Sequence, residues 1–365
     1  MNTKRKPPTI ADVAALAGVS AQTVSNFLTG RFKPRGQNLQ RLEAAISELG
    51  YRPSAAARAL RLKQSGIIAM LLEDDRDANA QHGRQGWEPL HAMFVYGAIQ
   101  RARDLGFYLT PVLTRQGAAE TEAIRLIREG RADGLICSTE LMPEAQLERL
   151  QRIARTEKVP IALLQENRKR DFICSVAAAD ENGGEQAAEH LAGLGHSHVA
   201  IATVKPSWPG PVRRREGFEA AAARLGLSVE VWEADAYAVE AIRRRAAPEL
   251  ARQDRPTAVF AVNDVIAVAL MQQAIELRLD VPRDLSVLGF NDLDVATHVR
   301  PALTTLRTPG AAMGARAVEV LIDAIGGKPL ASTALLPVEF VGRESTGAAP
   351  GKRRADDAAR PGAQV

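Results

Sequence analysis

Aromatic residues and cysteines are scarce in this chain of 365 residues. Phe, Trp and Tyr together make up 4% of the sequence, so the core must be built mainly from Ala, Leu, Val and Ile. The two cysteines, Cys137 and Cys174, lie in strand-like segments. This usage predicts two buried thiols in the reducing cytoplasm rather than a disulfide framework.

Long apolar runs are also missing, because the longest apolar stretches have only the length of strands. This excludes a membrane-spanning helix. The basic N-terminus has no apolar segment before a cleavage site, which excludes a signal peptide. We therefore expect a cytoplasmic protein with no membrane partner.

Signatures of catalysis are absent as well. The sequence has no P-loop and no G-x-G-x-x-G after a strand, and its serines lack the nucleophile-elbow context. His196 and His198 have no Cys, Asp or Glu at metal-ligand spacing beside them. We therefore predict that the protein is not an enzyme and that it holds no cofactor and no metal.

Charge is present but unevenly distributed. The first 65 residues hold eleven Lys and Arg against three Asp and Glu, a balance of +8, so that the rest of the chain carries −4 of the formal net charge of +4. A small basic domain fused to a larger acidic one indicates a polyanion partner for the first domain. A solvated basic tail is the simpler alternative, but these charges alternate with a helical apolar pattern.

The first fifty residues contain the pattern of three short helices. Thr9 is a candidate N-cap for the first helix, and Gly18 lies in a tight turn. Ser20 is the candidate cap of the second helix, over Ala21–Thr29, and a third helix is expected over Asn38–Leu49. This arrangement is typical of a helix-turn-helix domain, which we assign to residues 1–53. The alanine-rich stretch of residues 54–64 is too short for a stable isolated helix, and we interpret it as a hinge.

From Gly66 onward, apolar strands alternate with amphipathic helices. Repeated β-α units predict parallel sheets with helices on both faces, and their number requires two subdomains with a cleft between them. We expect this core over residues 65–346, with one subdomain over about 65–165 and 293–325 and the other over about 166–292 and 326–346. The tail, 347–365, is rich in Ala, Gly, Pro and charge and is expected to be disordered.

Several motifs carry a resemblance to a known family. The stretches TIADVAALAGVSAQTVSNFL and ELGYRPSAAARAL, and in the core GHSHVAIA, RRREGFEAA, VFAVNDVIAVALMQQA, DLSVLGFNDLD, PALTTLRTP and FVGREST, resemble the lactose and galactose repressor (LacI/GalR) family in order and spacing. The resemblance covers roughly Thr9 to Ser345. It implies an all-α DNA-binding domain joined to an α/β core of two doubly wound parallel-sheet subdomains, similar to periplasmic binding proteins. It further implies a homodimer and an effector in the cleft that changes operator affinity.

The second helix carries the candidate base-reading residues. The N-terminal residues of a recognition helix reach base edges in the major groove, and Gln and Asn pair bidentately with adenine. The resemblance assigns base reading to Ala21, Gln22 and Asn26. Thr23 and Ser25 match positions that bind phosphate on double-stranded operator DNA, and a solvated helix face is the alternative for these two. Further candidates for backbone contacts are Thr9, Tyr51 and Arg52.

The hinge provides a second candidate contact. In relatives, paired hinge helices lie in the minor groove and a leucine enters a central base step, a position that Leu60 occupies here, while the small Ala57 lets the two helices meet. A two-fold dimer implies a pseudo-palindromic operator. One departure from the family is the entry to the third helix, KPRGQN, which lacks the usual Ser or Thr cap.

Candidate effector ligands lie where strands of the core end. Asp264 follows the strand VFAVN, at the edge where ligands bind in open α/β sheets. A carboxylate there accepts hydrogen bonds from sugar hydroxyls; a plain helix cap is the alternative. Arg214 matches the family's ligand arginine, whereas Arg213 and Arg215 are expected to be surface charges. The weaker candidates are Asn291, Asp235, Tyr237, Trp208, Glu88 and Phe94.

The function predicted is that of a DNA-binding transcriptional regulator, a repressor, controlled by a sugar or sugar acid. A nucleobase or nucleoside effector stays open, because relatives that bind these also use an Arg and an Asp. A small-molecule binding protein without a regulatory role is the alternative from another class. The basic N-terminal domain argues against that alternative.

Overall fold

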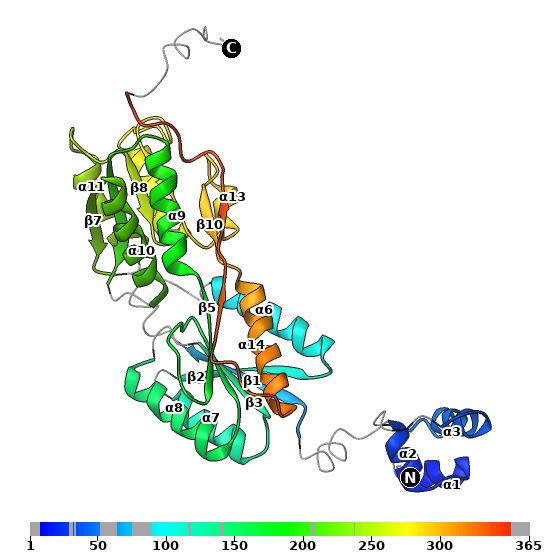
Figure 1. The fold of residues 1–365 in the computed structure, drawn as a ribbon. Coiled ribbons are helices and arrows are strands. Elements are labelled where there is room, and N and C mark those ends of the chain that lie inside the picture. Colours follow the sequence, from blue (N-terminus) through cyan, green and yellow to red (C-terminus); the bar gives the residue numbers. More distant parts are fainter. Residues whose placement is uncertain are drawn as a thin grey trace, which may run out of the picture. The chain divides into compact units, whose positions relative to one another are not determined.

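A computed structural model describes most of the chain, namely residues 8–28, 32, 34–51, 64–74, 89–115, 118–138, 142–205, 209–236 and 238–351. The chain forms two compact units, Met1–Ser65 and Gly66–Val365 (Figure 1). Within the described ranges, no helix combines the length and the apolar character that crossing a membrane requires.

Within its described residues the first unit packs three helices, which are α1 (Ile10–Ala17), α2 (Ala21–Leu28) and α3 (Gln37–Glu48). Their small core contains Val13, Ala14, Ala17, Val24, Leu42, Ala45 and Tyr51. The apolar residues of each helix recur every three to four positions, and this spacing places them on the one face that can be buried. The predicted helix-turn-helix arrangement is therefore confirmed.

Local hydrogen bonds explain where these helices begin. Thr9 and Asp12 form a reciprocal capping box at the start of α1, and Gly18, with a φ of 66°, makes the turn into α2. The Ser20 hydroxyl accepts a hydrogen bond from the backbone N–H of Thr23 at 3.1 Å. By contrast, α3 begins after Gly36 with no side-chain cap, as the departure from the family pattern in this loop predicts.

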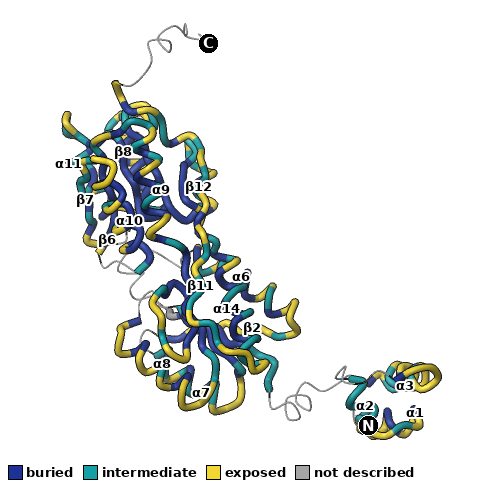
Figure 2. The backbone as a smooth tube through the Cα atoms, in the orientation of Figure 1, coloured by how far each residue is buried: buried dark blue, intermediate teal, exposed yellow. Residues whose placement is uncertain are grey.

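The first sheet of the second unit has six parallel strands in the order β11-β5-β4-β3-β1-β2. They are β1 (Ile67–Asp74), β2 (Tyr108–Arg115), β3 (Gly134–Ser138), β4 (Ile161–Leu164), β5 (Ile173–Ala178) and β11 (Thr333–Leu336). Four helices cover it, namely α6 (Pro89–Asp104), α7 (Ala119–Arg128), α8 (Glu144–Glu157) and α14 (Gly310–Ile325). Ile68 and Met70 pack into the core beneath α6 and α14, whereas Ala69 and Leu71 pack beneath α7 and α8. The strands are thus buried on both faces, as in a doubly wound sheet (Figure 2).

The second sheet has the order β7-β6-β8-β9. Its strands are β6 (His198–Val204), β7 (Ser228–Ala234), β8 (Ala258–Ala261) and β9 (Ser286–Leu288). The surrounding helices are α9 (Asp180–Gly193), α10 (Pro209–Leu225), α11 (Val239–Leu250), α12 (Asp264–Glu276) and α13 (Val295–His298). Beside this sheet, β10 (Thr305–Arg307) pairs antiparallel with β12 (Glu339–Val341).

The chain crosses between the two subdomains after β5, between β10 and α14, and between β11 and β12. These crossings differ from the expected bounds. Residues 166–178 belong to the first subdomain, because β5 pairs with β4, and Thr333 of β11 pairs with Ser175. Residues 293–307 belong to the second. The polar stretch after Gln165 is a connection within one sheet, held by ion pairs of Glu166 with Arg168 and Arg170.

The end of the core also differs from its expectation, because residues 347–351 are ordered on the second subdomain. The carbonyl of Gly347 lies 3.1 Å from Nε2 of the buried His196, and the N–H of Ala349 donates to the carbonyl of Leu194. These partners hold the backbone although its composition is typical of a disordered tail. Residues 352–365 lie outside the described ranges.

Candidate functional sites

The predicted recognition surface of the first unit is the exposed side of α2. Ala21 and Gln22 are exposed, and Asn26 is half-buried one helical turn further on. The amide Nε2 of Gln22 donates a hydrogen bond to Oδ1 of Asn26 at 2.9 Å. Residues four apart share one helix face, so the structure brings these two predicted base-reading amides together as a pair.

The other predicted DNA contacts have different surroundings. Thr9 caps α1, and the Thr23 hydroxyl lies 2.8 Å from that of Ser20. Tyr51 is buried in the core of the first unit, where its ring packs against other apolar side chains. Thr9, Thr23, Ser25 and Tyr51 stay predictions as phosphate contacts. The predicted contacts Arg52, Ala57 and Leu60 lie outside the described residues.

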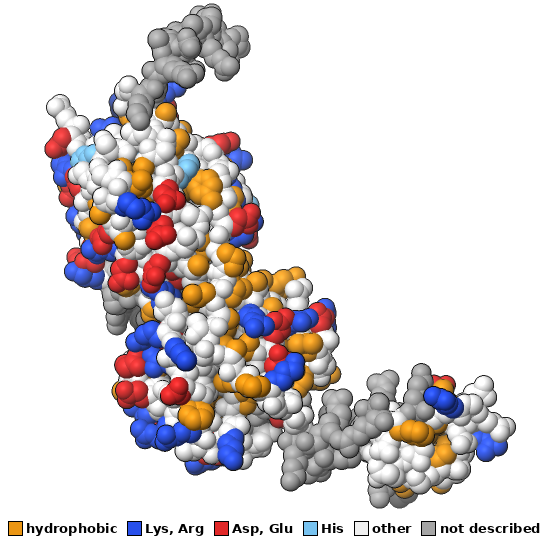
Figure 3. Space-filling view, viewed as in Figure 1, with side chains coloured by type: hydrophobic (Ala, Val, Ile, Leu, Met, Phe, Trp, Pro, Cys, Tyr) orange, Lys and Arg blue, Asp and Glu red, His pale blue; other side chains and the backbone are white. Residues whose placement is uncertain are grey.

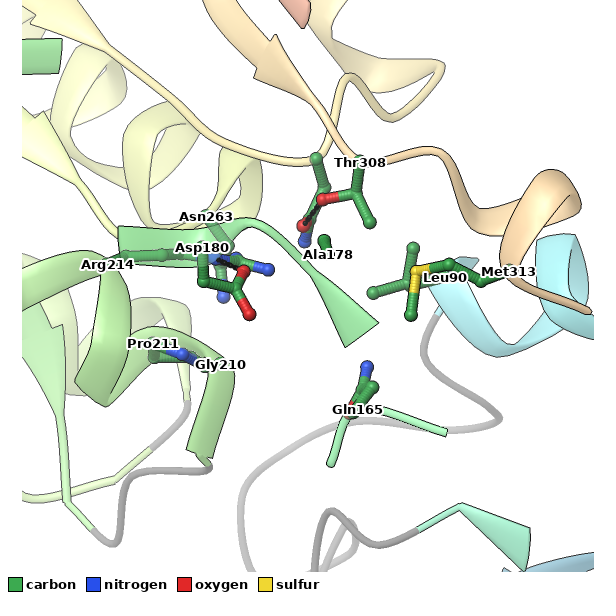
Figure 4. Close-up of a pocket in the computed structure, with 11 residues that line it drawn as sticks. Leu90, Gln165, Ala178, Asp180, Gly210, Pro211, Arg214, Asn263, Thr308 and Met313 are labelled. Atoms are coloured by element: carbon green, nitrogen blue, oxygen red, sulfur yellow. Dashed lines mark hydrogen bonds and ion pairs between the residues drawn. The ribbon is translucent and has the colours of Figure 1, made fainter. Parts of the chain in front are cut away.

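The second unit has a cavity where its two subdomains meet (Figure 4). Its empty space is about 440 Å³, a volume that includes open solvent at the mouth. Its lining comes from both subdomains and from the crossing segments: Leu90, Gln165, Ala178, Asp180, Gly210, Pro211, Arg214, Asn263, Asn291, Thr308 and Met313.

A buried cluster of three charges lies at one wall of this cavity, which two of them, Asp180 and Arg214, line. Asp180 Oδ1 accepts a hydrogen bond from Nε of Arg214 at 2.8 Å, and its Oδ2 accepts one from Nη2 of Arg213 at 2.9 Å. Arg214 also donates to the carbonyl of Val262 and stacks 3.8 Å from the ring centre of Phe290. The expectation that Arg213 is a surface charge is wrong, because its side chain is buried and reaches the carbonyl of Gln165 at 3.1 Å.

Close helix packing positions this cluster. A Cβ atom on Gly184 of α9 would lie 2.0 Å from the carbonyl oxygen of Arg214, and one on Gly217 of α10 would lie equally close to that of Glu181. Only glycine fits at both positions. The backbones of α9 and α10 therefore touch, and this contact holds Asp180, in the first turn of α9, beside Arg214, in the second turn of α10.

Asp264 is fully buried, with both carboxylate oxygens bonded inside the protein. Oδ2 accepts a hydrogen bond from the N–H of Leu293 at 2.7 Å, and Oδ1 accepts one from the hydroxyl of Thr305 at 2.6 Å. Burial raises its pKa to about 7, although these two bonds act in the opposite direction. Asp264 is not among the residues that line the cavity, and its role toward an effector stays a prediction. The alternative interpretation as a helix cap is wrong, since the side chain of Asn263 caps α12.

The weaker candidates for effector ligands differ in whether they line the cavity. Asn291 lines the cavity, where its Oδ1 accepts a hydrogen bond from the Thr308 hydroxyl at 3.0 Å. Asp235 is exposed and does not line it, and Phe94, which belongs to α6, is buried in the hydrophobic core. Tyr237, Trp208 and Glu88 lie outside the described residues.

Sequence reasoning missed three polar lining residues, Gln165, Asp180 and Thr308, as well as the apolar ones. Asp180 had a usable signal, because it opens a helix directly after the buried strand ICSVAA, as Asp264 does after its own strand. Gln165 and Thr308 had none, since they lie at a strand end and a crossing whose positions depend on distant pairings.

Comparisons with known proteins give matches for both units. Residues 9–54 match the family model described as bacterial regulatory proteins, lacI family, and residues 188–346 match that of a periplasmic binding protein-like domain. The chain is 30% identical to the HTH-type transcriptional regulator DegA of Bacillus subtilis over 342 residues, which span 93% of this chain and 98% of DegA. It is 32% identical to the regulator MalR of Streptomyces coelicolor over 359 residues, 94% of this chain and 98% of MalR.

Among solved structures, the chain is similar to the lac repressor dimer bound to operator and the anti-inducer ONPF. The TM-score is 0.73 at 27% identity, over 94% of this chain and 100% of that one.

Proposed function

Because this chain belongs to the lacI family of bacterial regulatory proteins, we propose that it is a transcriptional repressor that binds a pseudo-palindromic operator as a homodimer and responds to a small effector. A repressor of this kind acts on DNA in the cytoplasm, and its role requires no catalytic step. The observation that carries the proposal is the paired amides of Gln22 and Asn26 on the outer face of a helix-turn-helix within a segment of strong positive charge.

Operator binding requires two kinds of side chain, charged groups that attract phosphates and amides that recognise bases. Lys and Arg supply sequence-independent attraction to phosphates, which weakens as salt rises. The amides supply the donors and acceptors that distinguish adenine from the other bases in the major groove. The operator complex of the lac repressor dimer is the precedent in a similar chain.

An apolar surface on the second unit supports a homodimer. Tyr96 and Ile99 of α6 are exposed, and so are Tyr108 and Leu113 of the edge strand β2 beside it. Figure 3 shows hydrophobic side chains on the subdomain that carries α6. Exposed apolar groups gathered on neighbouring elements mark interaction sites, and we assign this face to contact with a second copy.

The cavity between the subdomains is the proposed effector site. A ligand there contacts both subdomains and the segments that cross between them, so it can bind two arrangements of the core with different affinity. Only that difference can change DNA affinity. A sugar or sugar acid is the expected ligand class, and a nucleobase is the alternative.

Selection of genomic fragments followed by anisotropy titration tests the proposal. The chain is expected to enrich fragments with a two-fold symmetric motif, and Gln22→Ala should lower affinity for that motif more than for random DNA. Gln40→Ala, which changes an exposed amide on α3 instead, is the matched control. Absence of any enriched motif, or equal losses on both DNAs, would contradict operator binding.

A further inference from the structure

The second unit begins at a residue whose backbone is held on both sides. After the stretch 54–64, the hinge expected from the sequence, and Ser65, the chain enters this unit at Gly66, directly before β1. The carbonyl of Gly66 accepts a hydrogen bond from the N–H of Tyr108 at 2.8 Å. The N–H of Gly66 donates to Oδ2 of Asp133 at 2.7 Å. The entry to the second unit is thus bonded to the starts of β2 and β3, the two neighbours of β1 in the sheet.

The backbone conformation of Gly66 makes this double attachment possible. In an extended strand, the N–H and the carbonyl of one residue bond to the same neighbouring strand. At Gly66 they bond to opposite neighbours, and its φ of 74° lies in the left-handed region that glycine adopts without strain. A Cβ atom there would meet open space, so the requirement for glycine is conformational rather than steric. The carboxylate of Asp133 then satisfies the amide that this conformation directs away from β2.

Asp133 is itself fixed by the sheet. Its N–H donates to the carbonyl of Ile67 at 2.8 Å, and Gly134, the next residue, pairs with Ile68 as the first residue of β3. The side chain of Asp133 is half-buried, and a hydrogen bond to a carboxylate is stronger than one between neutral groups. This side chain therefore extends the pairing of β1 with β3 by one bond, to the residue at which the chain enters the unit.

The attachment lies beside the face that is assigned above to a second copy. Tyr108 belongs to that face and bonds directly to Gly66. When one DNA-binding unit of a dimer occupies a half-site, the effective concentration of the other unit at the second half-site depends on how the connecting segment is held. We propose that Asp133 is a positioning residue for operator binding, because its bond to Gly66 fixes the point and the direction at which each hinge leaves the dimer. This inference rests on the operator-binding homodimer proposed above.

Hydrogen exchange in the full chain tests the attachment without DNA. Asp133→Ala should speed exchange of the Gly66 amide roughly tenfold, as expected for loss of a hydrogen bond to a charged group. Asp133→Asn retains an oxygen acceptor and should stay close to the wild type. Asp104→Ala is the control, because it removes an exposed carboxylate at the end of α6, shortly before β2, that is paired with Arg103. Unchanged exchange of the Gly66 amide in Asp133→Ala would overturn the proposed attachment.

Operator binding then tests the positioning role. Affinity is measured for DNA with a complete two-fold operator and for DNA with a single half-site. Asp133→Ala should lower affinity for the complete operator roughly tenfold, with half-site affinity and the dimer in sedimentation unchanged, and Asp133→Asn should restore most of the loss. A loss of the same size on the half-site, or no recovery in Asp133→Asn, would overturn the positioning role. A wild type with no preference for any symmetric DNA would instead contradict the proposed function, while the exchange experiment still decides whether Asp133 holds Gly66.

Discussion

Asp264→Asn is expected to remove a pH dependence from the stability of the second unit. The wild-type carboxyl is buried and its pKa is raised from 3.8 to about 7. An asparagine retains the shape of the protonated acid. Its oxygen can accept the hydrogen bond from Leu293, and its NH2 can donate to the hydroxyl of Thr305, which are the two partners of the carboxyl.

The direction and size of the effect follow from linkage. The Asp264 carboxyl keeps its proton in the folded state, whereas in the unfolded chain it releases that proton near pH 4. The contribution of this carboxyl to the free energy of unfolding is therefore fully present below that pH. It is lost as pH rises through about 7. In this window the free energy of unfolding falls by roughly 1.4 kcal/mol for each step of one in pH, so the wild type should lose roughly 2 to 3 kcal/mol between about pH 5 and about pH 8. The asparagine variant should lose none of this.

Urea unfolding of both proteins at the two pH values measures the difference. Other titrating groups are common to both proteins and cancel. One is Glu166, where burial acts to raise the pKa but hydrogen bonds from Arg168 and Arg170 lower it to about 2. The free energy of unfolding of the variant relative to that of the wild type should be larger near pH 8 than near pH 5, by roughly 2 to 3 kcal/mol. Parallel pH profiles for the two proteins would refute the reasoning, because they would mean that the Asp264 carboxyl ionises at the same pH in the folded and unfolded states.

Other expectations concern DNA binding, packing and assembly. A double-mutant cycle of Gln22→Ala and Asn26→Ala on the selected operator should give a coupling of about 0.5 kcal/mol or more, and additive losses would mean that the two amides act separately. Gly184→Val should destabilise the second unit by several kcal/mol in urea unfolding, roughly the cost of overpacking or more. Gly193→Ala is the control and should change stability little, because a Cβ atom there meets open space. Similar effects of the two substitutions would contradict the backbone contact. Deletion after Gly351 should leave a dimer in sedimentation, since Leu and Ile are absent from the removed segment; a change of assembly would disprove this. Operator affinity should fall steeply as salt rises in anisotropy titrations, and a flat dependence would contradict the phosphate contacts.

Much of the fold could be predicted because its signals are local. The helix caps at Thr9 and Ser20 and the turn at Gly18 each depend on neighbouring residues, and the alternation of strands and helices marks a doubly wound core. The subdomain bounds could not be predicted in the same way. They depend on which strand pairs with which, and the pairing of Thr333 with Ser175 joins segments far apart in the chain.

The site was predictable only in part, for the same reason. The motif identified Arg214 correctly as a polar residue near the cleft, and the structure has it in the cavity lining. It gave no indication that Arg213 is buried too, because that depends on how closely α10 approaches α9 and the end of β4. The inward direction of Asp264 likewise depends on Leu293 and Thr305, which follow it at a distance in sequence.

The order in which the chain is synthesised separates its two units in time. The contacts of the described core of the first unit can form once residue 51 has left the ribosome, because the core residues that the structure describes there run from Val13 to Tyr51. The second unit must wait for residues 333–341, since β11 completes one sheet by pairing with β5 and β12 pairs with β10. Domains fold as units during synthesis. A nascent chain therefore has a folded DNA-binding unit long before it has a complete sensor, and a product truncated before β11 would retain the first and lack the second.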